Sequence, residues 1–334
     1  MNPIYQAAQD RYAASESIYE RCGQSGVLLP KISLGFWHNF GGIDPYERSR
    51  AITRYAFDHG ITHFDLANNY GPPYGSAEQT MGRLLKDDFA PYRDELFISS
   101  KAGFDMWDGP YGNWGSRKYL MASLDQSLKR MGLDYVDLFY SHRFDPLTPI
   151  EETLQALVDI VRAGKALYIG LSRWPLEALK FADKYLRERD VPLLIYQGRL
   201  HLLDRAPQEE GILDYCKENG IGFISFSPLA QGLLTDRYLN DIPADSRMAR
   251  EGSLKSERLT PELKAELHRL NAIAQSRGET LSEMSLAWVK AQAGVTSVLI
   301  GASSVKQLET NLKSIYAKPF SSEELQTIGY FRDF

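Results

Sequence analysis

The stretch HFDLANNYG (residues 63–71) begins like a buried strand and ends in polar side chains. Asp65 stands at the tip of this strand, and Tyr70 follows it in the turn. An aspartate at a strand tip either caps the next turn or takes part in chemistry. The neighbouring strands decide between these two interpretations, because they show which other side chains reach the same edge.

A short apolar strand, a loop and an amphipathic helix recur along the whole chain. Continuously apolar strands are typical of parallel strands that are covered on both faces. The predicted strands span residues 31–35, 62–66, 96–101, 136–141, 166–171, 193–197, 222–227 and 297–301. The predicted helices span residues 45–59, 76–87, 117–131, 150–163, 175–188, 208–218 and 282–292. About eight βα units predict an α/β protein with a (β/α)8 TIM barrel fold.

A doubly wound sheet is the alternative to the barrel. Such a sheet usually carries a glycine-rich phosphate loop directly after its first strand. Here the first strand runs into GFWHNFGG (35–42), and no G-x-G-x-x-G pattern opens a helix. The pattern therefore favours the barrel.

Three segments lie outside the βα pattern. Residues 19–30, YERCGQSGVLLP, predict an N-terminal β-hairpin that caps the bottom of the barrel. Two long connections, 102–116 and 228–259, are predicted to be functional loops at the C-terminal face. Since no composition shift marks a linker, we predict a single domain spanning residues 1–334.

The composition restricts the class of protein. A formal net charge of −5 argues against a nucleic-acid partner, because phosphate binding needs a basic surface. No apolar run reaches the roughly 20 residues of a membrane span, and the first residues lack the apolar core of a secretory signal. Cys22 and Cys216, far apart in sequence, suit a reducing compartment. We therefore expect a cytoplasmic protein without membrane insertion.

A metal site is not predicted. His59 and His63 have a spacing that metal ligands can adopt. Gly60 ends the helix between them, so the two side chains cannot share one helical face.

Polar residues at successive strand ends predict a definite chemistry. In a (β/α)8 barrel these ends meet at one face, which would bring together Asp65, Tyr70, Lys101 and His142. A lysine beside a tyrosine lowers the pKa of the phenol and makes it a usable general acid, while the aspartate orients the lysine. The histidine can donate a hydrogen bond to a carbonyl oxygen. Such a site protonates an alkoxide while a cofactor delivers hydride, since no side chain can supply it.

Each of these four residues also has a simpler interpretation. Asp65 could cap a turn, Tyr70 could fill a loop, and Lys101 could be a solvated charge. A lone histidine such as His142 is more often structural. Their coincidence at successive strand ends favours the catalytic interpretation.

Several segments resemble the aldo-keto reductase superfamily. The tetrad motifs of that family resemble FDLANNYG (64–71), ISSKAG (98–103) and DLFYSH (137–142). Its nicotinamide and phosphate segments are similar, in the same order, to GLSRW (170–174), YQ (196–197), SFSPLAQGLL (225–234) and SVLIGASSVKQLETNL (297–312). The details, WHNFG (37–41) and DMWDGPYG (105–112) among them, resemble the branch that holds bacterial L-glyceraldehyde 3-phosphate reductases and the β subunits of voltage-gated potassium channels.

The resemblance implies roles for individual residues. Asp65, Tyr70, Lys101 and His142 would form the catalytic tetrad, with Tyr70 as proton donor, and the cofactor would be NADPH/NADP+. The residues implied to bind this cofactor are Trp37, Asp65, Ser172, Arg173, Gln197, Phe226, Ser227, Leu229, Gln231, Gly232, Arg237, Arg247, Gly301, Ser303, Gln307 and Asn311.

Within this set, different residues would hold different parts of the cofactor. Phe226 would stack on the nicotinamide, and Ser172 and Gln197 would hold its carboxamide. The segment from Gly301 to Asn311 would grip the adenosine 2′-phosphate, a role that serine hydroxyls at a helix start can perform. From the residues alone, the favoured interpretation is that the serines of this segment only cap the helix. Arg237, and Arg247 or Arg250, would close over the cofactor phosphates.

The substrate pocket is predicted to be aromatic. The nominated residues are Trp37, Tyr70, Phe104, Trp107, Tyr111, His142, Arg143 and Trp174. Aromatic walls around a few polar groups suit a small carbonyl compound, and the resemblance implies a triose phosphate or a methylglyoxal-type substrate. A phosphorylated substrate needs a cation, for which Arg143 is the first candidate and Arg117 the second.

Alternative functions remain open. A cofactor-binding subunit that serves a protein partner, as the channel β subunits do, would keep the same tetrad with slow turnover. A hydrolase or lyase on the same barrel is disfavoured, because it would not need the cofactor segments. The resemblance allows oligomeric states from monomer to octamer, a homo-oligomer included.

Overall fold

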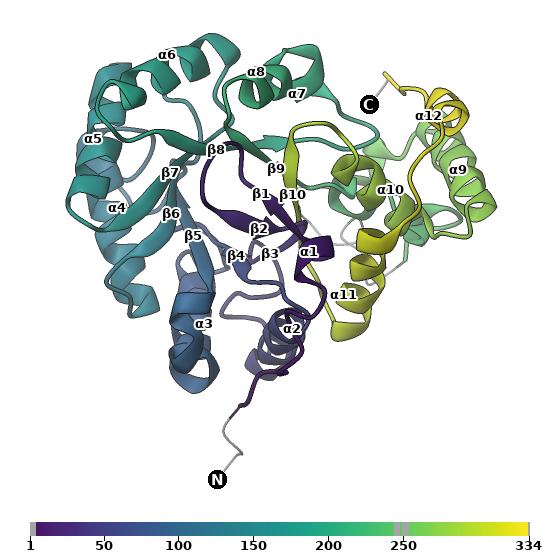
Figure 1. Cartoon of the computed structure of the whole chain (residues 1–334), viewed down its shortest axis with the longest axis horizontal. Helices are drawn as coiled ribbons and strands as arrows, with labels where there is room; N and C mark the ends of the chain where they lie inside the picture. Colours follow the sequence, from purple (N-terminus) through teal and green to yellow (C-terminus); the bar gives the residue numbers. More distant parts are fainter. Residues whose placement is uncertain (1–4, 244–247, 249–253, 333–334) are drawn as a thin grey trace.

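Eight parallel strands close into a barrel in the computed structural model, which describes residues 5–243, 248 and 254–332 (Figure 1). The strands are hydrogen-bonded in the order β10-β3-β4-β5-β6-β7-β8-β9. Their bounds are β3 (Ile32–Gly35), β4 (His63–Asp65), β5 (Phe97–Ala102), β6 (Val136–Ser141), β7 (Ala166–Ser172), β8 (Leu193–Arg199), β9 (Gly222–Phe226) and β10 (Val295–Ile300). The predicted (β/α)8 barrel is therefore confirmed.

Helices surround this barrel. Their bounds are α1 (Ser15–Ile18), α2 (Tyr46–Asp58), α3 (Ser76–Leu84), α4 (Arg117–Met131), α5 (Ile150–Arg162), α6 (Leu176–Arg187), α7 (Ala206–Glu209), α8 (Ile212–Glu218), α9 (Pro261–Ser276), α10 (Leu281–Lys290), α11 (Val305–Leu312) and α12 (Ser322–Ile328). The prediction of one helix over 208–218 is wrong. Gly211 adopts φ 75° between α7 and α8 and ends the first of them, a conformation that glycine takes without steric cost.

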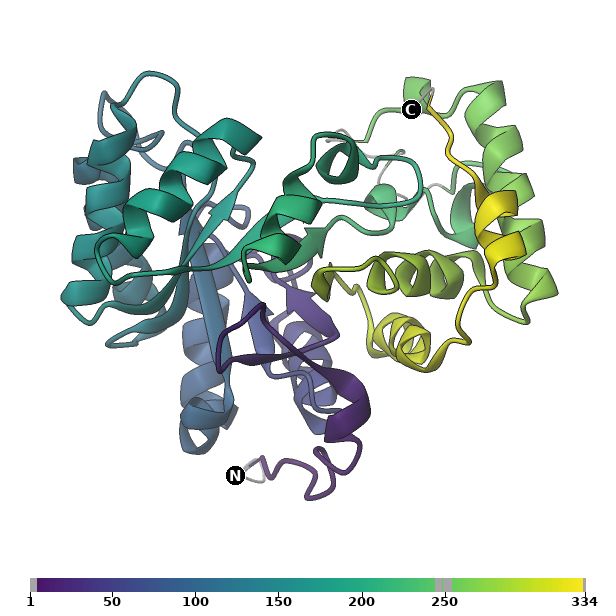
Figure 2. The same cartoon turned by 45° about the horizontal axis from the view of Figure 1, so that its top comes forward.

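The predicted hairpin is present and closes the N-terminal end of the barrel. Strands β1 (Tyr19–Arg21) and β2 (Leu28–Pro30) pair in antiparallel register. The side chains of Cys22 and Leu29 are fully buried against residues of the barrel interior, Leu138 and Leu194 among them. Figure 2 shows this hairpin in dark purple, next to the barrel strands that it caps. The opposite end of the barrel is left for the site.

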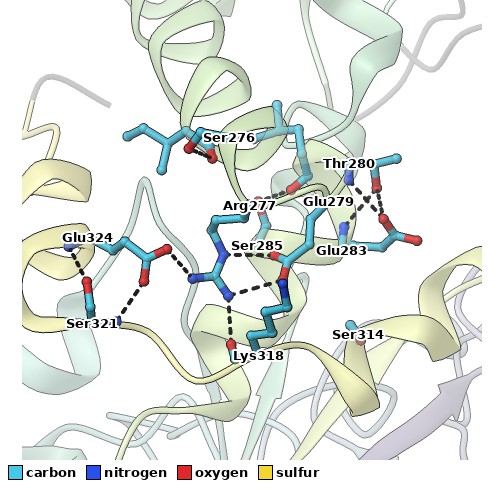
Figure 3. Close-up of polar contacts among 12 residues, drawn as sticks. Ser276, Arg277, Glu279, Thr280, Glu283, Ser285, Ser314, Lys318, Ser321 and Glu324 are labelled. Atoms are coloured by element: carbon cyan, nitrogen blue, oxygen red, sulfur yellow. Dashed lines mark hydrogen bonds and ion pairs between the residues drawn. The ribbon is translucent and has the colours of Figure 1, made fainter.

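The C-terminal segment is attached to the barrel helices by a cluster around Arg277. This residue follows α9, and its guanidinium donates to Glu279, to Glu324 at the start of α12, and to the carbonyl of Lys318 (Figure 3). The arginine side chain is only 4% exposed. A ring contact with Phe320, 3.9 Å from the guanidinium carbon, completes the cluster.

The two long connections follow β5 and β9, at the C-terminal ends of those strands. The second contains the short 3-10 segments η3 (Ala230–Gly232), η4 (Asp236–Tyr238) and η5 (Ser256–Arg258). Among the described residues, no helix is long and apolar enough to cross a membrane.

Candidate active site

A cavity of about 280 Å³ opens at the C-terminal ends of the strands. It brings together residues from most of the barrel strands and from both long connections. The lining residues are Gly35, Trp37, His38, Asp65, Asn69, Tyr70, Phe104, His142, Ser172, Arg173, Gln197, Phe226, Ser227, Pro228, Leu229, Gln231, Leu299, Ile300 and Gly301.

The four residues predicted to be catalytic lie together: Asp65, Tyr70 and His142 line the cavity, and Lys101 is fully buried beside them. Asp65 pairs with Ser99 on the neighbouring strand β5. Lys101 is two positions after Ser99, so its side chain is on the same face of the sheet as that of Ser99 and next to Asp65. The ammonium of Lys101 donates to Asp65 Oδ2 at 2.5 Å and lies 5.0 Å from the centre of the Tyr70 ring. The rings of Tyr70 and His142 meet edge to face at 5.9 Å.

The carboxylate of Asp65 is held from several directions. Its Oδ1 accepts hydrogen bonds from Ser99 Oγ at 2.7 Å and from Gln197 Nε2 at 3.3 Å. Lys101, in turn, donates a second bond to the carbonyl of Leu66 at 2.6 Å. Because Asp65 and Lys101 are fully buried, this ion pair is fixed in position beneath the tyrosine.

The pKa values at the site differ from the simplest expectation. Burial raises the pKa of Tyr70 well above its ordinary value, and the charge of Asp65 raises it further, while Arg173 acts in the opposite direction. The net shift of the Tyr70 pKa is therefore upward, opposite to the lowering that was expected from Lys101. Burial lowers the pKa of Lys101, although its bond to Asp65 opposes this.

His142 is a neutral imidazole in this environment. Burial, Lys101 and Arg173 all lower its pKa well below the ordinary value. Its Nδ1 is buried and has no hydrogen-bond partner among the described residues. The ring packs edge to face against Phe104 at 4.7 Å, so its orientation is set by contacts with both Phe104 and Tyr70.

Most of the residues predicted to hold the cofactor line the cavity. Ser172 Oγ is buried there and lacks a partner within the described part of the chain. Arg173, Ser227 and Gln231 adopt φ values of 55°, 52° and 60°. Non-glycine residues in this conformation carry backbone strain, which clusters at functional sites. The strain here coincides with the rim of the cavity.

Of the predicted 2′-phosphate segment, Gly301 lines the cavity, whereas Ser303, Gln307 and Asn311 lie outside its lining. The amide and hydroxyl of Ser303 both donate to Gln307 Oε1, at 2.8 and 3.0 Å. Ser304 is the N-cap of α11 and accepts from the amide of Gln307. Asn311 is buried, and its Nδ2 has no hydrogen-bond partner among the residues described.

Three further residues predicted to bind the cofactor lie outside the cavity lining or outside the described residues. Gly232 on η3 and the exposed Arg237 on η4 do not line the cavity. Arg247, together with its alternative Arg250, lies outside the described residues.

On the substrate side, the structure brings some predicted residues to the cavity and not others. Trp37 and Phe104 line it. Trp107 instead packs on the Tyr119 ring at 5.1 Å, and Tyr111 is 53% exposed outside the lining. Trp174 is only 1% exposed and donates from Nε1 to Ser141 Oγ, so it belongs to the core.

Neither arginine proposed for a substrate phosphate faces the cavity. Arg143 donates to the carbonyl of Gly103 at 2.6 Å and to Asn113 Oδ1 at 2.7 Å, and its guanidinium carbon lies 3.6 Å from the Trp114 ring centre. Arg117 forms an ion pair with Asp159. Among the lining residues of the described chain, the one arginine or lysine is Arg173.

Six lining residues were not nominated from the sequence: Gly35, His38, Asn69, Pro228, Leu299 and Ile300. His38 and Asn69 are each adjacent in sequence to a nominated residue. The signal that could have found them is this adjacency, because consecutive residues in a tight turn can both face one cavity.

Comparisons with known proteins agree with this geometry. The model of the Aldo/keto reductase family matches residues 31–332. L-glyceraldehyde 3-phosphate reductase of Escherichia coli K12 is 56% identical over 330 residues, which cover 97% of this chain and 94% of that protein. A probable voltage-gated potassium channel subunit beta of Arabidopsis thaliana is 33% identical over 307 residues, covering 90% of this chain and 92% of the subunit.

A solved structure shows the same fold. The crystal structure of the thermostable aldo-keto reductase Tm1743 with the inhibitor epalrestat superposes with a TM-score of 0.72. The two sequences are 29% identical, and the match covers 93% of this chain and 98% of the crystallised one.

Proposed function

Because the chain belongs to the aldo/keto reductase family, we propose that it reduces small aldehydes and ketones to alcohols with NADPH as cofactor. The observation that carries this proposal is the buried Asp65–Lys101 pair beneath Tyr70, with the neutral His142 beside the same phenol. These groups can protonate a carbonyl oxygen, and Asp65, Tyr70 and His142 line the cavity.

The residues around the cavity fit a nicotinamide cofactor. Ser172 Oγ and Asn311 Nδ2 are buried polar atoms that lack partners within the described chain, and such atoms are costly unless a ligand satisfies them. We propose that Ser172 and Gln197 hold the carboxamide and that the ring of Phe226 faces the nicotinamide. Ser303, Gln307 and Asn311 would bind the adenosine end.

Each residue of the tetrad then has its own role in the reaction. NADPH bound in the cavity supplies the hydride. His142 donates its single N–H to the carbonyl oxygen and orients it toward Tyr70. Tyr70 gives its proton to that oxygen, since its raised pKa keeps the phenol protonated at neutral pH. Lys101, held by Asp65, stabilises the phenolate that results.

A triose phosphate is the substrate we propose first. The Escherichia coli relative at 56% identity is a reductase of L-glyceraldehyde 3-phosphate. Arg173 provides the cation that a phosphate would need, as Arg143 and Arg117 are engaged elsewhere. Methylglyoxal, which is small and uncharged, is the second candidate substrate.

Initial rates with NADPH test this function. Tyr70→Phe should lower kcat for glyceraldehyde 3-phosphate by about 10²- to 10⁴-fold, because the general acid is lost. The NADPH dissociation constant, measured by fluorescence titration, should stay within about three-fold. Tyr111→Phe, which removes a hydroxyl outside the cavity, serves as the control and should keep wild-type turnover. Equal rates for the Tyr70 and Tyr111 variants would rule out the proposed proton donor.

A second candidate function is binding of a protein partner. The identity of 33% to a probable potassium channel β subunit supports it. In that case NADPH should bind tightly while turnover with every aldehyde stays negligible, and the same titration and rate assay separate the two functions. The cytoplasmic location and any homo-oligomer stay predictions, which fractionation and light scattering would test.

A further inference from the structure

A buried histidine lies beneath the catalytic aspartate and has no part in the mechanism above. His63 is two residues before Asp65 on β4, and its side chain therefore faces the same barrel interior. The ring is fully buried. Its Nε2 lies 3.0 Å from Ser99 Oγ, and Ser99 Oγ donates to Asp65 Oδ1 at 2.7 Å. One hydroxyl thus separates this imidazole from the tetrad.

The hydrogen bonds continue on the other side of the ring. His63 Nδ1 lies 2.8 Å from Ser33 Oγ, which lies 2.7 Å from Ser297 Oγ on β10. Ser297 Oγ donates to the carbonyl of Pro30 in the N-terminal hairpin at 2.6 Å. We call this series of groups, from Pro30 through Ser297, Ser33, His63 and Ser99 to Asp65, the interior chain.

A count of protons shows that the interior chain is one proton short. It has five contacts, and each of its ends, a carbonyl and a carboxylate, only accepts. Three serine hydroxyls supply three protons. Burial lowers the pKa of His63 to about 4, with Lys101 acting in the same direction and Asp65 in the other, so the neutral ring supplies only one more. Four protons must serve five contacts, and one contact lacks a proton.

The charge of Asp65 decides where that missing proton is. A hydrogen bond to a carboxylate is roughly twice as strong as one between neutral groups, so Ser99 keeps its proton on Asp65. Ser99 Oγ then needs a donor, and His63 Nε2–H is the group within reach. The positive end of this N–H dipole points toward the carboxylate. The missing proton is then at Ser297, whose one hydroxyl proton has to serve two contacts with neutral groups, Ser33 Oγ and the carbonyl of Pro30.

We propose that His63, in its neutral Nε2–H tautomer, is a positioning residue. It acts through Ser99 and fixes the direction of the hydrogen bonds in the interior chain, so that Ser99 Oγ donates to Asp65. The imidazole fixes the direction of the Ser99 hydroxyl. That hydroxyl holds the Asp65 carboxylate in the orientation that anchors Lys101 below Tyr70. The titratable groups that face the ring are Asp65 from its own strand and Lys101 from β5, while β3 and β10 bring serines. The bottom of the barrel is thereby linked to the chemistry at its mouth.

The tautomer can be read directly, without any assay of activity. In protein carrying ¹⁵N-histidine, long-range ¹H–¹⁵N correlation spectra distinguish a protonated ring nitrogen from an unprotonated one. The His63 signals are those that move in both Ser33→Ala and Ser99→Ala. We expect Nε2–H in the wild type and a change to Nδ1–H in Ser99→Ala, because the acceptor of the Nε2 proton is removed. An Nδ1–H ring in the wild type would overturn the proposal.

Turnover gives a second test, which rests on the proposed reductase function. Ser99→Ala should lower kcat about ten-fold, since hydrogen bonds to charged groups are strong, with KM and NADPH affinity nearly unchanged. Ser99→Thr keeps the hydroxyl and should restore kcat.

Ser100→Ala is the matched control for Ser99→Ala. It removes an equally buried hydroxyl of β5 that donates to a different carboxylate, Glu78, on the outer face of the strand. Equal kcat values for Ser99→Ala and Ser100→Ala would contradict the positioning role. If the wild-type protein shows no turnover, the proposed reductase function is wrong. The NMR measurement of the His63 tautomer would still test the positioning role.

Discussion

At the scale of single residues, the pH dependence of the reaction follows from Tyr70 and His142. The pKa of Tyr70 is raised, so its acid form is complete at neutral pH and is lost only when the pH rises past that raised value. The pKa of His142 is lowered well below its ordinary value by burial and by nearby cations, so the imidazole is already neutral at neutral pH. The reductive kcat should therefore be level from about pH 6 to pH 9, given ordinary values near 6.5 and 10. A stopped-flow pH profile with an inflection inside this interval would contradict these assignments.

A substitution of Arg173 tests whether this residue binds the phosphate group of a substrate. Arg173→Gln removes the cation from the cavity while leaving a polar side chain of similar reach. The KM for glyceraldehyde 3-phosphate should rise about ten-fold or more, because an interaction with a phosphate is lost, whereas the KM for methylglyoxal should change little. Steady-state kinetics with both substrates measure this difference. A parallel rise of both values would instead indicate that Arg173 serves the cofactor.

The sequence could predict which residues stand at the mouth but not where each side chain points. Strand alternation and the barrel rule were enough to bring Asp65, Lys101 and His142 together. They could not tell that Arg173 and Trp174, adjacent in sequence, diverge. Arg173 has φ 55° at a bend of the chain, which leaves the arginine at the cavity and the tryptophan in the core. Such bends depend on tertiary packing, which no local pattern records.

At the scale of helices and strands, Arg277 is expected to be the main attachment of the C-terminal segment. Arg277→Met would leave Glu279 and Glu324 without their shared cation in a largely buried place. We expect a loss of about 2 to 4 kcal/mol in the free energy of unfolding, as for other broken buried pairs. Lys180→Met, which breaks an exposed pair with Glu177, is the control and should cost less than about 1 kcal/mol. Urea unfolding compares the two, and similar losses would disprove the special role of Arg277.

The elements themselves were largely predictable. All eight barrel strands lie within two residues of the predicted ranges, because continuous apolar runs between glycine-ended helices are a strong signal. Helix α9 was not predicted, although Thr260 as N-cap and Pro261 in the first turn mark its start. The division between α7 and α8 was missed, since the helical pattern continues through Gly211.

At the scale of the whole molecule, the closed end provides stability and the open end provides the site. Leu29→Ala should therefore lower the free energy of unfolding by about 2 to 5 kcal/mol, the usual loss for a fully buried leucine, and leave kcat unchanged. Leu28→Ala, its neighbour on the same hairpin strand, removes a side chain that is 52% exposed and should cost less than about 0.5 kcal/mol. Urea unfolding and initial rates of both variants measure the separation. A large fall in kcat for Leu29→Ala would contradict the expectation that this side chain contributes to stability alone. The single-domain organisation of residues 1–334 stays a prediction at this scale.

The closed end also carries the first described residues of the chain. Tyr5 donates to Asp58, and Arg11 pairs with Glu95, both of which precede the starts of barrel strands. A linker attached near Tyr5 would therefore join the molecule to a solid support at the end opposite the cavity. Substrate and cofactor would diffuse in from the bulk solution without passing the support. An electrode or bead coated in this orientation should thus retain the specific activity of the protein in solution.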